Sequence, residues 1–146
     1  QTSDDKTARI INRCFETSEY DDAVKRLKQS GINVITHVIF GLPAETQEQM
    51  LDTVNHCVKA GTDGIKFTCL YVLKGTVLER MWRSGEFEVL GEEEYFDIVG
   101  KALELLQSDT VVHRMTGDGP KSSLLAPEWT ADKRSVINYI NRRFDL

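Results

Sequence analysis

The sequence predicts an α/β fold in which parallel strands alternate with helices. Residues 32–40 and 65–73 are nearly continuous apolar runs, rich in β-branched and aromatic side chains, as is typical of strands covered on both faces. Between these runs, Thr46 and Gln49 have the spacing of a capping box, and Gly61 provides a left-handed helix stop. This strand–helix–strand order predicts one right-handed βαβ unit.

A weak internal repeat supports the same class. The segments LKQSGINVITHVIFGLP and VKAGTDGIKFTCLYVLKGT each contain a helix end, a glycine, a strand and a glycine-containing loop. Successive α/β units of this kind predict a barrel, a partial barrel or a doubly wound sheet.

Further helices are expected on both sides of this unit. Before it, Ser3 to Asp5 have the composition of an acidic helix start. Ser18 is then expected to cap a second helix. After the unit, we expect a short helix capped by Thr76, a longer helix over 91–107, a strand over 111–116 and a final helix capped by Thr130.

The composition is that of an ordinary globular domain. The 146 residues are 40% apolar and 28% charged, which excludes a disordered chain and matches about one domain. No apolar run approaches the roughly 20 residues of a membrane span, so we expect a cytoplasmic protein without a membrane partner. The net charge of −5 does not indicate nucleic-acid binding. Basic residues do cluster in the final helix, where we interpret them as a solvated face.

The cysteines do not indicate a metal site. Cys14, Cys57 and Cys69 are odd in number and lack a CxxC spacing. Two of them fall in a predicted helix face and a predicted strand, where a free cysteine behaves as a small core residue. We therefore expect neither disulfides nor metal ligands.

Two turn-rich loops follow predicted strands. The loop Gly41-Leu42-Pro43-Ala44 lies at the carboxyl end of the first strand, where ligands bind in α/β folds, although such a loop is also an ordinary tight turn. The loop GDGP at 117–120 follows His113 and Arg114. These two side chains could reach an anionic group or serve only the fold, and spacing alone favours the second interpretation.

Several motifs together resemble a known family. They are Gln1-Thr2, Ile11-Asn12-Arg13, HVIFGLP at 37–43 and HRMTGDGP at 113–120, with the segments LKGT and APEWT. The chain resembles the C-terminal half of a radical S-adenosylmethionine (SAM) iron–sulfur protein, in the branch that contains the elongator catalytic subunit and oxygen-independent coproporphyrinogen oxidase. Within that branch it is most similar to bacterial radical-SAM proteins of unassigned substrate.

The resemblance implies the C-terminal part of a partial (β/α)₆ TIM-like barrel followed by an α/β extension. Residues 1–75 would hold strand five at 33–40 and strand six at 65–73 with their helices, and residues 76–146 would form the family-specific extension. The chain would begin just after the fourth strand, so we expect a fragment of a longer protein. Strand five would keep an unpaired edge, which predicts either self-association (a homo-oligomer) through that edge or a cover over it.

The resemblance also implies contacts with SAM. By position, Gln1 matches a residue that touches the SAM ribose, and Arg13 matches a basic residue that reaches the SAM carboxylate. His37 stands where relatives carry an aspartate to the ribose, and an imidazole can still make one hydrogen bond.

Further contacts are implied for the adenine and for the substrate. The loop residues Gly41, Leu42 and Pro43 would pack on the adenine, beside the strand-six backbone at Leu70 or Tyr71. The candidate substrate contacts are Lys66, Lys74, His113, Arg114 and Asp118.

The cofactors implied by the resemblance are SAM and a 4Fe-4S cluster. The longer protein would be an oxidoreductase that reductively cleaves SAM to methionine and a 5′-deoxyadenosyl radical, which acts on an unknown substrate. The CxxxCxxC loop that holds such a cluster is absent from this sequence. We therefore expect no catalytic residue, no metal ligand and no activity in this chain alone, and the missing N-terminal half would be its partner.

Two other functions stay open at this point. The elongator resemblance and the basic final helix favour a tRNA-associated binding module, whose affinity for tRNA would depend on salt. A cluster-free, phosphate-handling α/β enzyme would instead use the helix that starts near Glu45 as an anion site, with His37 as the one base in reach of the loop at 41–44.

Overall fold

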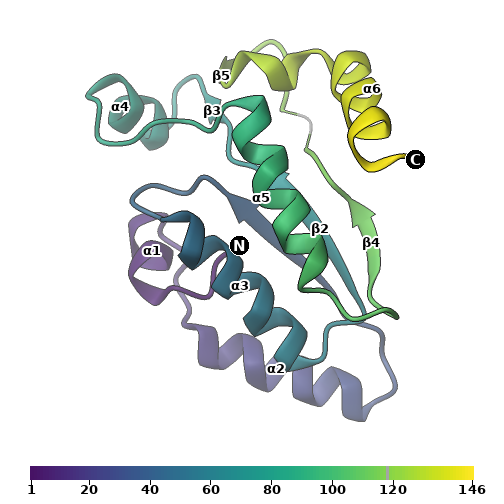
Figure 1. Cartoon of the computed structure of the whole chain (residues 1–146). Coiled ribbons are helices and arrows are strands. Elements are labelled where there is room, and N and C mark those ends of the chain that lie inside the picture. Colours follow the sequence, from purple (N-terminus) through teal and green to yellow (C-terminus); the bar gives the residue numbers. More distant parts are fainter. Residues whose placement is uncertain (118) are drawn as a thin grey trace.

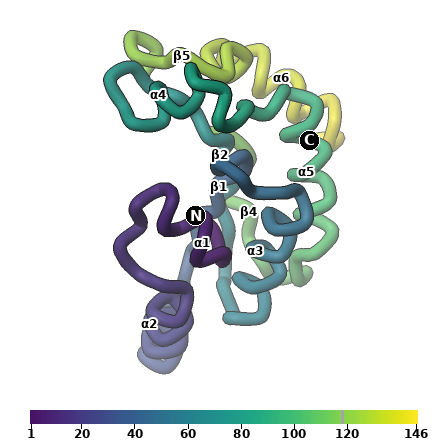
Figure 2. Tube along the Cα trace, turned by 90° about the vertical axis from the view of Figure 1, so that its left-hand side faces the viewer, coloured from purple at the N-terminus to yellow at the C-terminus, as the bar shows by residue number. Residues whose placement is uncertain are grey.

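A parallel sheet with the strand order β1-β2-β4 forms the centre of the chain, and helices α3 and α5 cover one of its faces (Figures 1 and 2). The computed structural model describes residues 1–117 and 119–146. In chain order, the elements are α1 (Asp5–Ile10), α2 (Thr17–Gln29), β1 (Ile35–Phe40), α3 (Gln47–Ala60), β2 (Gly64–Cys69), β3 (Val72–Leu73), α4 (Val77–Arg83), α5 (Glu92–Glu104), β4 (Val111–Arg114), β5 (Leu124–Ala126), the 3₁₀ helix η1 (Glu128–Ala131) and α6 (Lys133–Phe144).

The predicted βαβ unit is confirmed. β1 and β2 pair in parallel, from Ile35 opposite Gly64 to Phe40 opposite Cys69. The connecting helix α3 starts with the capping box of Thr46 and ends at Gly61, whose φ of 89° is the left-handed conformation that glycine adopts without strain. These local signals are enough to direct the chain from one strand to the next.

Alternate side chains of β1 and β2 build the core against α3 and α5. Val38, Phe40, Ile65 and Phe67 are at most 1% exposed and belong to one cluster with residues of both helices. The rings of Phe40 and Phe67 stack with centroids 5.3 Å apart. Because full burial of one such side chain contributes roughly 1.5–3 kcal/mol, this layer fixes which face of the sheet the helices cover.

The sequence predicted a single strand over residues 65–73, but the structure divides this run into two strands. β2 ends at Cys69, and the next two strand residues form β3, which pairs antiparallel with β5. The last parallel step is the hydrogen bond of 2.9 Å from Leu70 N to Phe40 O. Beyond it, β1 turns into its loop at Gly41 and offers no further partner. The first run is also shorter than expected, because β1 starts at Ile35 and not at residue 33.

Two helix caps differ from those predicted. α2 is capped by Glu16 and not by Ser18, and α6 is capped by Asp132 and not by Thr130. Carboxylates suit the positive end of a helix, and the Thr130 hydroxyl is already bonded to Pro127 O at 2.8 Å. Among the described residues, none of the helices has the length and apolar character that crossing a bilayer requires.

Gln1 extends the sheet on the outer side of β1. Its ammonium group donates to His37 O at 2.7 Å, and its carbonyl accepts from Ile39 N at 3.0 Å. These two bonds flank Val38 in the pattern of a neighbouring parallel strand. The remainder of this edge is open, and the Ile35 side chain is 41% exposed. Whether the edge also mediates self-association stays a prediction.

The expected extension shares the sheet and the core with the residues that precede it. β4 pairs in parallel with β2, and α5 supplies Tyr95 and Phe96 to the central cluster. The β3–β5 ribbon and α4 surround a second, smaller cluster at the carboxyl end of the sheet, which contains Leu42 and Leu70. Residues 1–75 and 76–146 therefore pack together, and the domain boundary between them stays a prediction.

Candidate functional site

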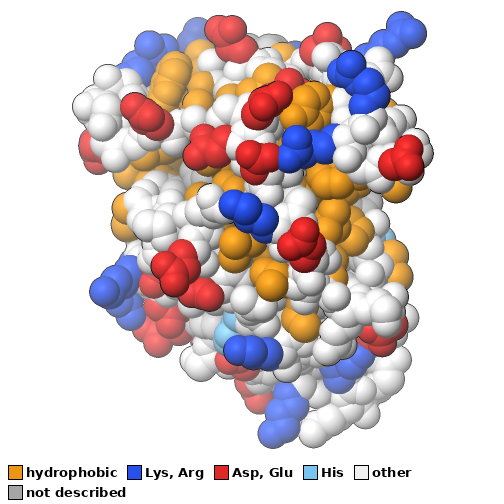
Figure 3. Space-filling view, in the orientation of Figure 1, with side chains coloured by type: hydrophobic (Ala, Val, Ile, Leu, Met, Phe, Trp, Pro, Cys, Tyr) orange, Lys and Arg blue, Asp and Glu red, His pale blue; other side chains and the backbone are white. Residues whose placement is uncertain are grey.

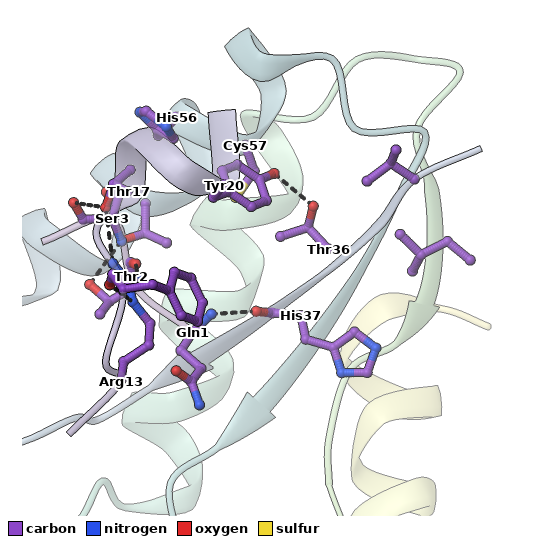
Figure 4. A pocket seen from close by; sticks show the side chains of 14 residues that line it. Gln1, Thr2, Ser3, Arg13, Thr17, Tyr20, Thr36, His37, His56 and Cys57 are labelled. Atoms are coloured by element: carbon purple, nitrogen blue, oxygen red, sulfur yellow. Dashed lines mark hydrogen bonds between the residues drawn. The ribbon is translucent and has the colours of Figure 1, made fainter. Parts of the chain in front are cut away.

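The face of the sheet opposite α3 and α5, here called the open face, carries a line of basic side chains. Successive residues of a strand point to opposite faces of the sheet. On β1, Thr36 points to the covered side with Val38 and is buried, whereas His37 points to the open face and is exposed. Figure 4 shows Thr36 directed to Tyr20 of α2, and the His37 imidazole projecting away from it. On β2, Lys66 lies between the fully buried Ile65 and Phe67 and so points to the open face as well.

The strand register places three basic residues side by side. His37 is opposite Lys66, and Lys66 is opposite Arg114. We call His37, Lys66 and Arg114 the cationic row. The sequence named all three residues, although for different purposes, and the structure brings them together.

A β-bulge in β4 completes this arrangement. The register passes from Ile65 opposite Val112 directly to Lys66 opposite Arg114, so His113 is the extra residue. The His113 ring lies against Gly64, where an added Cβ would come within 2.8 Å of the imidazole Cδ2 and Nε2 atoms. The bulge therefore allows both His113 and Arg114 to face the open side, which strict alternation would not.

The strand register gathers positive charge on the open face. Burial lowers the pKa of His37, and the nearby charges of Lys66, the N-terminal ammonium and Arg114 lower this pKa further. The sequences of β1, β2 and β4 contain no Asp or Glu. Within residues 1–117 and 119–146, Lys66, His113 and Arg114 have no ion-pair or hydrogen-bond partner through their side chains. The helix-covered side differs, because basic and acidic side chains are interspersed there (Figure 3).

The loop after β1 is held by packing. Gly41 has a φ of 87°, and an added Cβ would come within 3.0 Å of the Leu90 side chain. Leu42 and Leu70 are 4% and 8% exposed and lie in the small cluster at the carboxyl end of the sheet. Pro43 is also buried. Contact of this loop with an adenine stays a prediction.

Arg13 lies in the segment between α1 and α2, where it binds the protein itself. Its guanidinium pairs with Asp5 at 3.0 Å, donates to the backbone oxygens of Thr2 and Phe15, and donates to the Thr17 hydroxyl. The Arg13 side chain is only 6% exposed. The expected contact with a SAM carboxylate stays a prediction, and the observed contacts anchor the turn between the two helices.

Two further candidates, Lys74 and Tyr71, follow the end of β2. Lys74 is exposed at the end of β3, and its N–H donates to Ser123 O at 2.8 Å in the small ribbon. Tyr71 lies between β2 and β3 beside Gly119. Asp118 lies outside the described residues.

A cavity of about 320 Å³ lies along the open edge of β1, and its lining brings together three of the residues predicted to contact SAM: Gln1, Arg13 and His37. Its lining comes from β1, the chain start and helices α2 and α3, and includes Tyr20, Thr36, His56 and Cys57 (Figure 4). The Tyr20 hydroxyl bonds the Thr36 hydroxyl at 2.8 Å, and burial raises the pKa of the Cys57 thiol. No local pattern marks these residues, because their elements meet only in the folded chain.

Comparison with known proteins identifies the family. A family model described as the Radical_SAM C-terminal domain matches residues 62–145. The uncharacterized protein YtqA of Bacillus subtilis is 34% identical over 99% of this chain and 45% of its own length. The chain therefore spans about half the length of this curated relative.

Two further comparisons concern proteins of Methanocaldococcus infernus. Its tRNA uridine(34) acetyltransferase is 26% identical over 80% of this chain and 23% of that protein. A solved structure of the archaeal Elp3, with an N-terminal deletion, matches with a TM-score of 0.80 at 21% identity. This match covers 99% of the chain and 35% of that structure, and it shows the shared fold.

Proposed function

Because the chain belongs to the Radical_SAM C-terminal domain family, we propose that it forms the C-terminal part of a longer enzyme that cleaves SAM reductively. The family match over residues 62–145 carries this proposal, and the greater length of the relatives supports it. When bound, SAM and its iron–sulfur cluster supply a carbon radical that abstracts hydrogen from a substrate. This chain would contribute the open face as one wall of the reaction site.

The cluster itself does not fit the residues described. Within residues 1–117 and 119–146, no group of three or more His, Cys, Asp or Glu could hold a metal ion. Cys57 and Cys69 are buried in the core at 4% and 1% exposure, and Cys14 is exposed elsewhere. The cluster ligands would therefore come from the rest of the longer protein.

For SAM, we propose that His37 is the principal contact from this chain. Its imidazole projects from the sheet (Figure 4) and has no hydrogen-bond partner in the described part of the chain, so it can bond a ribose hydroxyl. Gln1, Gly41, Leu42, Pro43 and Leu70 would support this contact mainly through the backbone. Arg13 would first have to release Asp5 and the turn that it anchors.

The test uses the full-length protein from which this segment comes. It is reconstituted anaerobically with iron and sulfide, supplied with SAM and a reductant, and assayed for 5′-deoxyadenosine. We expect product formation, and we expect His37→Ala to weaken SAM binding about tenfold through the lost hydrogen bond. Lys101→Gln, on the exposed side of α5, serves as the control. Failure to assemble a cluster or to form 5′-deoxyadenosine would refute the proposal.

tRNA binding is a second candidate because one relative is named a tRNA uridine(34) acetyltransferase. The cationic row is compatible with it, since phosphate contacts by Lys and Arg supply affinity that falls as salt rises. Filter binding of unmodified tRNA to the full-length protein at two salt concentrations tests this. An affinity that does not change with salt would argue against it.

The cluster-free phosphate enzyme has less support. The start of α3, which would be its anion site, is closed by its own capping box: Gln49 N donates to Thr46 Oγ1 at 3.3 Å, and Thr46 N donates to Gln49 Oε1 at 2.8 Å. The adjacent Glu45 adds a carboxyl group that would repel an anion. His37 lies on the open face, away from this helix end.

A further inference from the structure

We propose that Lys66 and Arg114, flanked by the imidazoles of His37 and His113, bind a phosphate group of the protein's substrate. This inference rests on the proposed function, because it makes the open face the side on which the substrate lies. It adds the chemical class of the ligand, a phosphate-bearing molecule, and the residues that recognise it.

The first argument is geometric. His37, Lys66 and Arg114 occupy successive strands in direct register, and neighbouring strands are about 4.8 Å apart. Their side chains therefore start from one line of about 10 Å across the sheet. The bulge at His113 is what brings Arg114 opposite Lys66, and bulges characteristically re-aim side chains at functional sites.

The second argument is energetic. Like charges directly opposite each other on neighbouring strands are destabilising, and Lys66 and Arg114 form such a pair. Elsewhere in the described chain, Arg13, Lys28 and Arg143 each pair with an aspartate. Among the described residues, no aspartate or glutamate forms an ion pair with Lys66 or Arg114. A bound anion would supply the negative charge that offsets their repulsion.

The third argument is the match between donors and acceptors. Lys66 offers three N–H donors and Arg114 offers a planar fork that binds phosphate through two parallel bonds. A phosphate monoester carries a charge of about −1.5 to −2 and three acceptor oxygens, whereas a carboxylate carries one charge and two oxygens. Two permanent cations with two imidazoles beside them suit the phosphate better.

The surroundings also favour a ligand over a bare solvated surface. The open face is lined by apolar groups around the row: Ile35 is 41% exposed and Val111 is 55% exposed. The helix-covered side has no comparable segregation of charge, because both signs are interspersed there (Figure 3).

The experiment titrates the isotopically labelled 146-residue chain with inorganic phosphate near neutral pH, at constant ionic strength, and follows the ring signals of His37 and His113 by NMR. We expect saturable shifts of both rings. Lys66→Gln and Arg114→Gln should each weaken binding about tenfold, and Lys66→Arg should largely restore it. Lys101→Gln makes the same charge change on α5 and should leave the affinity unchanged. The amide spectrum of each variant confirms that it is folded.

Three outcomes would overturn the inference. The first is the absence of saturation. The second is an equal loss of affinity in Lys101→Gln, which would mean that binding follows net charge only. The third is succinate binding as tightly as phosphate with the same dependence on Lys66, which would make this a carboxylate site. The titration contains no SAM, so its failure is independent of the 5′-deoxyadenosine assay that tests the proposed function.

Discussion

Gln1 lies beside Val38 as a residue of a neighbouring parallel strand would, with hydrogen bonds of 2.7 Å to His37 O and 3.0 Å from Ile39 N. This relationship defines the direction in which the chain before Gln1 would run in a longer protein. It would pass along the open edge of β1 and over the cavity lined by Tyr20 and Thr36.

The first prediction follows from this geometry. Under the proposed function, a strand added before Gln1 should pair the His37 amide, which points to the same edge as the His37 carbonyl. We expect hydrogen exchange of that amide to slow in the extended chain, and any self-association of the 146-residue chain to decrease. Hydrogen-exchange NMR and analytical ultracentrifugation measure the two effects. Unchanged exchange at His37 would mean that the added strand does not dock there.

The second prediction concerns the buried guanidinium between α1 and α2. Arg13→Met removes the ion pair with Asp5 and leaves the Thr2 and Phe15 carbonyls without their donor. Because breaking a buried pair costs about 3–5 kcal/mol and Asp5 keeps some solvent contact, we expect a loss of about 2–4 kcal/mol in the free energy of unfolding. Urea denaturation measures it.

Arg9 provides the matched control for this substitution. It pairs with Glu16 on the surface, where both side chains are at least 60% exposed. Arg9→Met should therefore change the free energy of unfolding by less than about 1 kcal/mol. Similar losses for the two variants would show that the burial of Arg13 does not matter.

The third prediction uses the carboxyl group of Glu45. Burial raises its pKa above the ordinary value of 4.5, although the bond from the Thr2 hydroxyl lowers the pKa in part. The native state then binds more protons than the unfolded state in the interval above pH 4.5, so the free energy of unfolding falls as pH rises through that interval. Glu45→Gln should remove this fall while keeping an acceptor for Thr2. Denaturation experiments from about pH 4 to 7 give the free energy of unfolding of the unchanged chain and of Glu45→Gln. The same dependence on pH in both proteins would contradict the prediction.

The fourth prediction separates two reasons for a glycine at position 41, its positive φ and its close approach to Leu90. Its φ of 87° disfavours any side chain, and an added Cβ would also meet Leu90 at 3.0 Å. Gly41→Ala should lower the free energy of unfolding by about 2–4 kcal/mol. Gly85 has a φ of 76° with open space around it, so Gly85→Ala should show only the backbone strain, about 1 kcal/mol. Thermal or urea denaturation measures both variants. Equal decreases in the free energy of unfolding would mean that the Leu90 side chain moves aside without an energetic penalty.

The βαβ unit could be predicted from the sequence, because its signals are local. A capping box needs only Thr46 and Gln49, a helix stop needs only Gly61, and an apolar run marks a covered strand wherever its partner lies. The motif resemblance similarly identified the family that the comparisons then showed.

The way in which these elements combine into a site could not be predicted from local patterns. The end of β2 at Cys69 depends on where β1 stops, and the pairing of Arg114 with Lys66 depends on a bulge in a strand far along the chain. The burial of Arg13 depends on the turn that folds around it. Strand register, burial and ion pairing arise from contacts between segments that are distant in the sequence, so local patterns do not predict them.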